Sequence, residues 1–450
     1  MTFDETLLTL LRCPTTGSAL TRYGQVLRAE DDTYEYPLIE GVPWLLPHPR
    51  NSLLDWGAKL HHFQQVLMGE IEQLEREGKR SEGLTRERLA KMHAAKQSFL
   101  ASVIDLIRPV VTTQVAEKSL YDTLRNRAPS IQNLLSYEAN LYRDWVWGDE
   151  ENAQCRDIVL GEVGDLAPQR MLVLGAGSGR LAVDLHTALA PPTTLATDIN
   201  PLLLLTAERV ISGKTFSLYE FPHEPRRLAD MAVEQTLRGL DTPPSGLHLA
   251  FADAMSSPFA PESFDLVVTP WLIDIQPFEL GLFLRQLNSY LPTGGVWANF
   301  GSLVFNQSRD AYCYTVEEIE GIARENGFEL GDCRETEMPY LRSPHNAGYR
   351  MERVWSWRAE KTRHIAPAED VQVLPEWLLD VSRPIPKTRY FQAFAQQHRV
   401  CAELTSEIDG KTSVKTIARR LARQNRVDPN EAMEMVRNFL LEIYQQNHPV

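Results

Sequence analysis

Residues Met171–Arg180 read MLVLGAGSGR, an apolar run that passes through three alternating glycines into the periodic stretch LAVDLHTALA. The apolar run predicts a buried strand, and the periodic stretch predicts a helix. Glycines at such a junction let the backbone turn tightly and approach a ligand closely. The stretch therefore predicts a strand–loop–helix unit with a ligand at the loop. A plain strand-to-helix turn without a ligand is the alternative.

Short apolar strands alternate with helical segments on the C-terminal side of this unit, as far as about residue 358. The other strand candidates are TTLATDI (193–199), LHLAFAD (247–253), FDLVVTP (264–270) and GVWANFG (295–301). Such alternation predicts an α/β fold with a doubly wound, Rossmann-like parallel sheet. The loop spacing is GxGxG, whereas dinucleotide folds use GxGxxG. The spacing is more typical of S-adenosylmethionine sites, so Gly175, Gly177 and Gly179 are predicted to bind that cofactor.

Polar residues stand where the next strands end. Asp198 lies 23 residues after Gly175 and could accept both hydroxyls of a ribose, although it could instead cap a helix that begins at Pro201. Asp253 could bind an adenine amino group or be an ordinary turn residue. Pro270 closes the fourth strand and completes the predicted cofactor set on the sheet.

The stretch from about 137 to 360 resembles the carnosine N-methyltransferase family of class I methyltransferases. The resemblance rests on YRDW at 142–145, GAGSGRL at 175–181, RRLAD at 226–230, Ile273-Asp274, and LPTGGVWANFG at 291–301. That family binds S-adenosylmethionine in a doubly wound sheet and methylates an imidazole nitrogen of a histidine-containing dipeptide. The resemblance implies an N-methyltransferase fold and activity for this chain.

The resemblance also implies roles for individual residues near the cofactor. Asn140 and Arg143 fall where the family closes over S-adenosylmethionine. An ion-paired helix residue is the alternative for Arg143. Asp274 falls where a carboxylate holds the substrate imidazole, which makes it the predicted catalytic and substrate-binding residue. Capping of the following helix is the alternative for Asp274.

Three further positions fall near the family's acceptor site. Tyr340 and Tyr349 lie near its substrate-contacting tyrosines, and Tyr349 could equally be a strand residue. Asn306 stands where the family places a histidine. An asparagine can hydrogen-bond but cannot titrate near neutrality, so this difference bears on the acceptor more than on the cofactor.

The chain divides by pattern into four predicted segments. Residues 1–50 resemble a small zinc-ribbon-like family that includes a methyltransferase activator; only Cys13 stands where paired cysteines are usual, so a β-ribbon without metal is expected. Residues 51–150 predict a helical cap or lid, and 151–360 the methyltransferase domain. Residues 361–450 predict a linker and a winged-helix-like helical domain.

The last segment carries a second resemblance. Residues 400–446 are similar to peptide-binding domains of ribosomal-peptide modification pathways, which hold a leader peptide as an added strand. The run from Lys411 to Arg426 contains six basic residues and no acid, which also suits DNA or a plain solvated helix face. The expected partner is therefore a small-molecule or peptide acceptor, with a leader peptide possible at this segment.

Composition narrows the remaining classes of function. The 450 residues carry a net charge of −14, which disfavours general binding of nucleic acid. No apolar run is long enough to span a bilayer, and the five scattered cysteines fit a reducing, cytoplasmic location. Two rival hypotheses remain: a non-catalytic methyltransferase-like regulator that binds peptide or DNA, and a methyltransferase acting on tRNA or protein.

Overall fold

The computed structural model describes residues 3–111, 134–256, 258–276, 279–305, 307, 310–367, 382–425 and 427–447. These residues fall into two compact units. The first comprises residues 1–67 and 74–369, and the second comprises residues 370–450 with the short segment 68–73. This division into two units does not test the four segments that were predicted from the sequence. Those four segments therefore remain a prediction.

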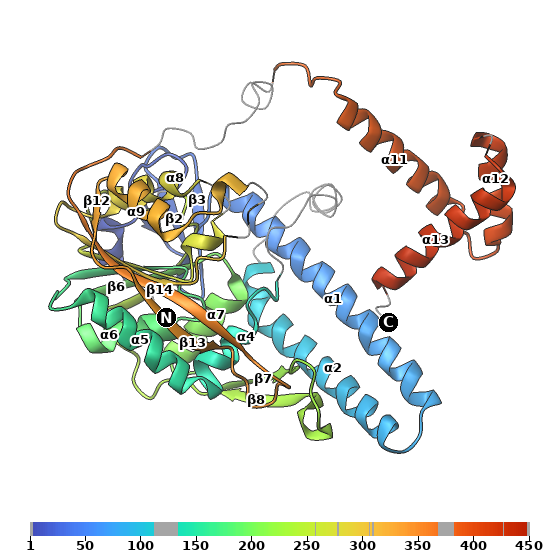
Figure 1. The fold of residues 1–450 in the computed structure, drawn as a ribbon, viewed down its shortest axis with the longest axis horizontal. Coiled ribbons are helices and arrows are strands. Elements are labelled where there is room, and N and C mark those ends of the chain that lie inside the picture. The colour runs from blue at the N-terminus through green and yellow to red at the C-terminus, as the bar shows by residue number, and fades with distance from the viewer. Residues whose placement is uncertain are drawn as a thin grey trace. The chain divides into compact units, whose positions relative to one another are not determined.

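A parallel sheet forms the centre of the first unit (Figure 1). Its strands lie in the order β9-β6-β5-β10-β11, all parallel, and β14 then pairs antiparallel with β11. The bounds are β5 Arg170–Leu174, β6 Thr193–Asp198, β9 Leu247–Ala252, β10 Leu266–Pro270, β11 Val296–Gly301 and β14 Arg350–Lys361. Every residue of β10 and β11 is buried, as expected when helices cover both faces. The predicted doubly wound sheet is confirmed.

Helices cover the two faces of this sheet. Figure 1 shows α8 and α9 above the sheet and α5 and α6 below it, as drawn. The bounds are α5 Asp149–Val163, α6 Arg180–Leu189, α7 Pro201–Ile211, α8 Leu280–Tyr290 and α9 Val316–Glu325. Short 3-10 turns lie at Ile273–Ile275 (η4) and Asp310–Tyr312 (η5), and strands β12 Phe328–Leu330 and β13 Arg334–Tyr340 flank β14.

The direction of chain progression reverses at β5. From β5 the chain moves outward to β6 and β9, and it then returns to place β10 on the other side of β5. Ligands of open α/β sheets bind at the carboxyl ends of the strands where the order reverses in this way. The carboxyl ends of β5, β6, β9 and β10 therefore mark the candidate site.

The N-terminal ribbon is continuous with the central sheet. After the 3-10 turn η1 Glu5–Thr9, strands β1 Leu20–Tyr23, β2 Val26–Ala29, β3 Glu35–Ile39 and β4 Val42–Leu45 form an antiparallel meander. Strand β4 then pairs in parallel with β9, with Trp44 opposite Phe251. The ribbon thus extends the central sheet at its β9 edge.

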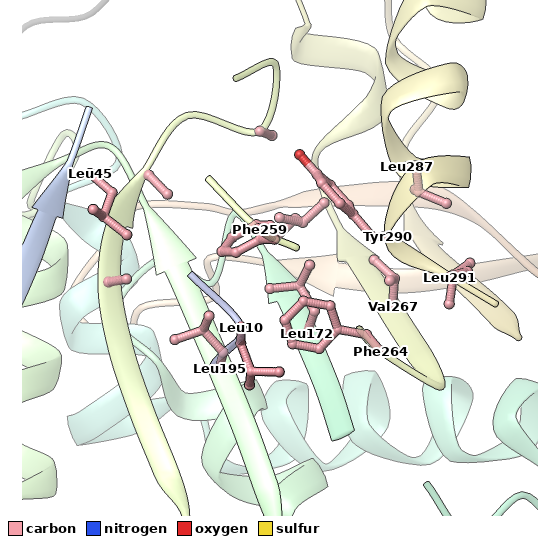
Figure 2. Packing of buried hydrophobic residues seen from close by; sticks show 14 of the residues in the cluster. Leu10, Leu45, Leu172, Leu195, Phe259, Phe264, Val267, Leu287, Tyr290 and Leu291 are labelled. Carbon is pink, nitrogen blue, oxygen red and sulfur yellow. The ribbon is translucent and has the colours of Figure 1, made fainter. Parts of the chain in front are cut away.

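The ribbon also shares the hydrophobic core of that sheet. Figure 2 shows Leu10 from the N-terminal region beside Leu172 of β5 and Leu195 of β6, and Leu45 belongs to the same buried cluster. A backbone hydrogen bond from Ala260 N–H to Leu10 O, 2.7 Å long, fastens the same region. Because these side chains are buried together, the N-terminal ribbon and the sheet share one hydrophobic core.

Helical and hairpin insertions pack beside the sheet. The long helices are α1 Pro49–Arg80 and α2 Gly83–Val111, followed later by α4 Ala139–Tyr142 and the π-type turn η2 Arg143–Trp147. A separate hairpin, β7 Phe216–Glu220 with β8 Val233–Leu237, carries the 3-10 turn η3 Leu228–Met231 between its strands. Phe99 of α2 meets Phe221 edge to face at 5.5 Å between ring centroids, so α2 packs against this insertion.

The second unit contains three helices among its described residues: α11 Arg389–Ser406, α12 Val414–Asn425 and α13 Pro429–Asn447. Leu404, Ile417, Ala418 and Val436 form its small buried core. None of the helices in the described ranges combines the length and apolar content needed to cross a bilayer.

Candidate functional site

The glycine loop between β5 and α6 has one open position. Gly175, Gly177 and Gly179 all have positive φ angles, of 69°, 58° and 86°. A Cβ on Gly175 would lie 2.9 Å from Leu272 Cδ1, and one on Gly179 would lie 3.1 Å from Ala207 Cβ. A Cβ on Gly177 would meet nothing within 4 Å. The first and third glycines are therefore closely packed against neighbouring side chains, whereas the second faces open space that a ligand can fill.

Asp198 joins this loop to the end of β6. Its Oδ2 accepts the Gly177 backbone N–H at 2.9 Å, and its Oδ1 accepts the Asn200 N–H at 2.8 Å. Burial raises the pKa of Asp198 to about 6, and these backbone N–H groups oppose the rise. The cap of α7 is Asn200, whose side chain accepts from the Leu202 N–H at 3.0 Å. The helix-cap interpretation of Asp198 is therefore wrong.

Asp253 and Pro270 stand at the ends of β9 and β10. Asp253 is half-buried, and its Oδ1 accepts the Met255 N–H at 2.9 Å, which is a turn contact. Burial raises the pKa of Asp253 as well. Pro270 is buried opposite Phe300 of β11. Both residues lie at the same edge of the sheet as Gly175 and Asp198, although the turn contact shows that Asp253 also has a structural role.

The segment that contains YRDW holds the glycine loop from outside the sheet. Asp144 is 3% exposed, and its Oδ2 accepts the Ser178 hydroxyl at 2.5 Å. Arg143 Nε donates to Asp144 Oδ1 at 2.8 Å, and Trp145 Nε1 donates to the Ser178 carbonyl at 2.9 Å. Arg143 is thus an ion-paired helix residue, which is the alternative given for it above. Its partner Asp144 holds the glycine loop through Ser178. Direct contact of Arg143 with the cofactor stays a prediction.

Asp274 is a buried carboxylate just beyond the end of β10. It is 5% exposed, and its Oδ2 accepts the Ser302 hydroxyl at 2.7 Å. Burial raises the pKa of Asp274, and the Ser302 hydroxyl opposes the rise together with the backbone N–H groups of Asp274 and Val304. Asp274 does not cap α8, which begins at Leu280 after Glu279. The helix-cap interpretation is therefore wrong here too.

An aromatic group lies beside this strand end. The rings of Trp271 and Tyr340 are 4.8 Å apart between centroids, and Arg350 lies over the Tyr340 ring at 4.4 Å. Tyr349 is 53% exposed and lies under Arg342 at 5.0 Å. The structure therefore brings Tyr340 to the site. Among the described residues it shows no contact between Tyr349 and the site. Asn306 lies outside the described residues.

Tyr137 belongs to the site although the sequence did not single it out. Asp274 and Asp198 both act electrostatically on its hydroxyl, and burial is the larger cause that raises the pKa of Tyr137. Its turn is fastened to the end of β6, because Asn200 Nδ2 donates to the Ser136 carbonyl at 3.1 Å. Tyr137 adopts φ of 65°, which is rare for a non-glycine residue and has no local sequence signal.

Unpartnered polar atoms concentrate at this site. In the described part of the chain, four buried side-chain polar atoms have no hydrogen-bond partner, and three of them are Asn140 Oδ1, Trp271 Nε1 and Asp274 Oδ1. The fourth is Trp357 Nε1, in the core of the sheet. Buried polar groups are nearly always paired, so unpaired atoms in residues just beyond β10 and in α4 fit a ligand-binding site. No cluster of three metal-ligating side chains occurs in the described ranges.

Comparisons with solved structures give distant similarities. The Haemonchus contortus phosphoethanolamine N-methyltransferase 2 is 15% identical with a TM-score of 0.35, over 53% of this chain and 61% of that one. The N-methyltransferase NodS from Bradyrhizobium japonicum is 16% identical with a TM-score of 0.34, over 51% of this chain and 98% of that one. A complex of the Haloferax volcanii Trm112 methyltransferase activator with a putative methyltransferase gives 11% identity and a TM-score of 0.32, over 50% of this chain and 98% of that one. The chain thus spans less than two thirds of the length of the Haemonchus enzyme.

The family comparison is more specific than these structures. No curated protein matches the chain. A family model described as carnosine N-methyltransferase matches residues 122–362, which include the glycine loop, the carboxylates at the strand ends and the YRDW segment. The match covers more than half of the chain. This protein is therefore an S-adenosylmethionine-dependent methyltransferase, and it belongs to the carnosine N-methyltransferase family.

Proposed function

We propose that this enzyme transfers a methyl group from S-adenosylmethionine to an imidazole nitrogen of a histidine-type acceptor, either a small molecule or a peptide. The observation that carries the proposal is Asp274. One of its carboxylate oxygens is held by Ser302, and the other is buried without a partner among the described residues. A buried acceptor atom of this kind suits a ligand that brings an N–H group.

The cofactor part of the site fits S-adenosylmethionine. The space at Gly177 allows a ligand to approach the loop backbone. Asp198, which holds that loop through the Gly177 N–H, would accept the ribose hydroxyls. Asp253 at the next strand end and Asn140, with its unpaired Oδ1, complete the residues that would hold it. The cofactor supplies an electrophilic methyl group on a sulfonium when bound.

The acceptor part of the site then needs orientation more than it needs a base. A neutral imidazole already carries a lone pair on one nitrogen. Asp274 would accept the N–H of the other nitrogen, which selects the tautomer and stabilises the ring as it becomes cationic. Ser302 fixes the carboxylate for this task. Tyr137, which interacts electrostatically with both Asp198 and Asp274, would cover the junction and exclude water.

A methyl-transfer screen tests the proposal. The full chain would be incubated with S-adenosylmethionine labelled in the methyl group and with L-histidine, histidine-containing dipeptides and short histidine peptides. We expect label to appear on an imidazole nitrogen, located by fragmentation mass spectrometry, in at least one acceptor. Label on an amine, carboxylate or thiol acceptor, with none on any imidazole, would contradict the proposal.

We propose further that the second unit binds a peptide and so determines the acceptor. Helix α12 carries Lys415, Arg419, Arg420 and Arg423 and no acidic residue, and Arg420 pairs with Glu407 before the helix. A chain ending at Ala366 should keep its cofactor affinity. With a peptide acceptor its KM should rise at least tenfold, whereas with free histidine it should change little. Equal KM values for a peptide in the two chains would contradict this role.

A further inference from the structure

Glu220, the last residue of β7, is a buried carboxylate that the proposed reaction does not use. Its Oε1 accepts the hydroxyl of Ser343, in the β13–β14 loop of residues 341–349, at 2.6 Å. Its Oε2 accepts the Gln235 amide of β8 at 2.6 Å and the Trp147 indole N–H of η2 at 3.3 Å. Taking a carboxylate out of water is costly, and these three donors offset that cost. Glu220 therefore joins the β7–β8 hairpin to η2 and to the β13–β14 loop.

The β13–β14 loop has further ties to its surroundings. Both oxygens of the buried Glu151 carboxylate, in α5, accept backbone N–H groups of this loop: from Leu341 at 3.0 Å and from Arg342 at 2.7 Å. Asp230, the last residue of the RRLAD stretch, lies 2.9 Å through its Oδ1 from His345 Nδ1. Leu341 adopts φ of 53°, in the left-handed region that bulky residues rarely occupy. Such conformations persist where surrounding contacts over-determine them, and they concentrate at ligand-binding sites.

The loop begins directly after Tyr340, which connects it to the site. The Tyr340 ring packs against that of Trp271, just beyond β10, at 4.8 Å between centroids. Burial raises the pKa of the Tyr340 hydroxyl, and the Arg143 guanidinium opposes that rise. Tyr340 is thus within reach of both the end of β10 and the YRDW segment. A side chain in such a place keeps its position only if the backbone that carries it is fixed.

We propose that Glu220 is a positioning residue for methyl transfer: through Ser343 it fixes the β13–β14 loop, which keeps Tyr340 in place as a preformed wall for the acceptor. The inference rests on the proposed function, because it takes the acceptor to bind at the end of β10. An acceptor that meets an ordered wall does not have to order it on binding. Loosening the loop should therefore weaken acceptor binding. Cofactor affinity should persist, because Asp144 holds the glycine loop separately through Ser178.

Ser343→Ala removes the hydrogen bond to the loop and leaves Glu220 its other two donors. The matched control is Ser356→Ala in β14, because Ser356 is also buried and donates to a buried carboxylate, Glu162 Oε1, at 2.7 Å. Ser356 pairs with Arg334, at the opposite end of β13 from the loop. The two variants remove the same kind of hydrogen bond from two ends of one hairpin. A difference between them therefore reports the location of the bond.

Initial rates of the full-length enzyme would be measured with saturating S-adenosylmethionine and with L-histidine and β-alanyl-L-histidine as acceptor probes. We expect Ser343→Ala to raise the acceptor KM about tenfold, the scale of one buried hydrogen bond, and to change kcat less than about threefold. Ser356→Ala should keep the acceptor KM within about twofold of the wild-type value. Calorimetry should give a Kd for S-adenosylhomocysteine within about twofold of wild type for both variants.

Hydrogen exchange measures the hold on the loop without any acceptor. In peptides that cover residues 338–349, amide exchange should be at least about tenfold faster in Ser343→Ala and in Glu220→Ala than in the wild type, and unchanged in Ser356→Ala. Glu220→Gln should restore nearly the wild-type rate. Its amide oxygen can face the two donors at the Oε2 position, and its NH₂ group can donate to the Ser343 hydroxyl, which also accepts.

The outcomes separate this inference from the proposed function. An acceptor KM that is unchanged in Ser343→Ala, or raised equally in Ser356→Ala, would overturn the inference while the proposed function stands. Unchanged exchange in Ser343→Ala would overturn it in the same way, as would an equal loss of S-adenosylhomocysteine affinity, which would show a general structural role. Absence of methyl transfer to every imidazole probe would overturn the proposed function and this inference with it.

Discussion

Asp274→Asn separates the catalytic role of the carboxylate from any structural role. The asparagine keeps the size of the side chain and an oxygen that can accept from Ser302. At the unpaired Oδ1 position it puts an amide NH₂, which would face the ring N–H of the acceptor as a second donor. The change thus removes both the charge and the hydrogen bond at the point where the imidazole becomes cationic.

The expected loss follows from where the charge develops. Removing one preorganised electrostatic group typically lowers kcat by about 10²–10⁴, which corresponds to about 2.7–5.5 kcal/mol of transition-state stabilisation. Ser302→Ala leaves the charge in place and removes only its support, so we expect a smaller fall, of about tenfold. The affinity for S-adenosylmethionine should be unchanged in both variants, because Asp274 lies beyond the strand end.

Stability should move in the opposite direction. Burial raises the pKa of Asp274 above its ordinary value of 3.8, so the folded state favours the protonated carboxyl. The stability that this shift contributes is present below about pH 3.8 and is lost as the pH rises through the folded pKa. Near neutral pH the ionised group therefore costs stability, and Asp274→Asn should have an equal or higher Tm.

Initial rates with labelled S-adenosylmethionine, calorimetry of cofactor binding and thermal unfolding would test all three expectations. Full turnover of Asp274→Asn on its acceptor would refute the reasoning, since it would leave the carboxylate without a role in catalysis. A fall in activity matched by a fall in Tm and in cofactor affinity would also refute it, because the residue would then be structural.

Three further variants test the cofactor loop and the surrounding network. Gly177→Ala should weaken S-adenosylhomocysteine binding at least tenfold in calorimetry. Gly24→Ala is the control, because Gly24 has a similar φ of 62° and equal open space; this variant should lose the same stability and keep its affinity for S-adenosylhomocysteine. Equal affinities in the two variants would place the site elsewhere. Asp198→Ala should weaken cofactor binding by about 1.5–3 kcal/mol, the scale of charge-assisted hydrogen bonds, and unchanged affinity would remove the ribose assignment. Glu138 lies just before α4 and accepts the Tyr142 hydroxyl at 3.0 Å. Burial raises the pKa of Glu138 to about 7 from 4.5, so the stability from this shift is full below about pH 4.5 and is lost as the pH rises through about 7. Glu138→Gln should therefore raise the Tm at about pH 8.5 and change it little near pH 5, and a Tm difference independent of pH would contradict this.

The sheet and the cofactor loop were predictable because their signals are local. The apolar strand, the alternating glycines and the helix after them lie within 20 residues, and the left-handed φ of Gly177 is a conformation that glycine readily adopts. Asp198 had two interpretations that only the structure could separate, since Asn200 sits two residues later and takes the cap. Adjacent polar residues at a strand end compete for one role, and sequence spacing does not decide between them.

The acceptor side was less predictable because it depends on contacts between distant segments. Tyr137, 137 residues before Asp274 in the chain, is close enough for that carboxylate to act electrostatically on its hydroxyl, and it adopts a positive φ of 65°. Trp271 adopts a positive φ of 50° where its backbone lies against Gly301 of the neighbouring strand. Tyr349, by contrast, was predicted at the site from a loose register and lies exposed under Arg342. Each of these outcomes depends on tertiary geometry, which produces no periodic pattern in the sequence.

The parallel pairing of β4 with β9 has a consequence for how the chain is made. Trp44 and its partner Phe251 are separated by 207 residues, so at about 5–20 residues per second a ribosome needs about 10–40 s to deliver the second after the first. During that interval strand β4 presents apolar side chains, among them Leu45, that have no sheet to join. We infer that the ribbon depends on chaperones until β9 has been synthesised.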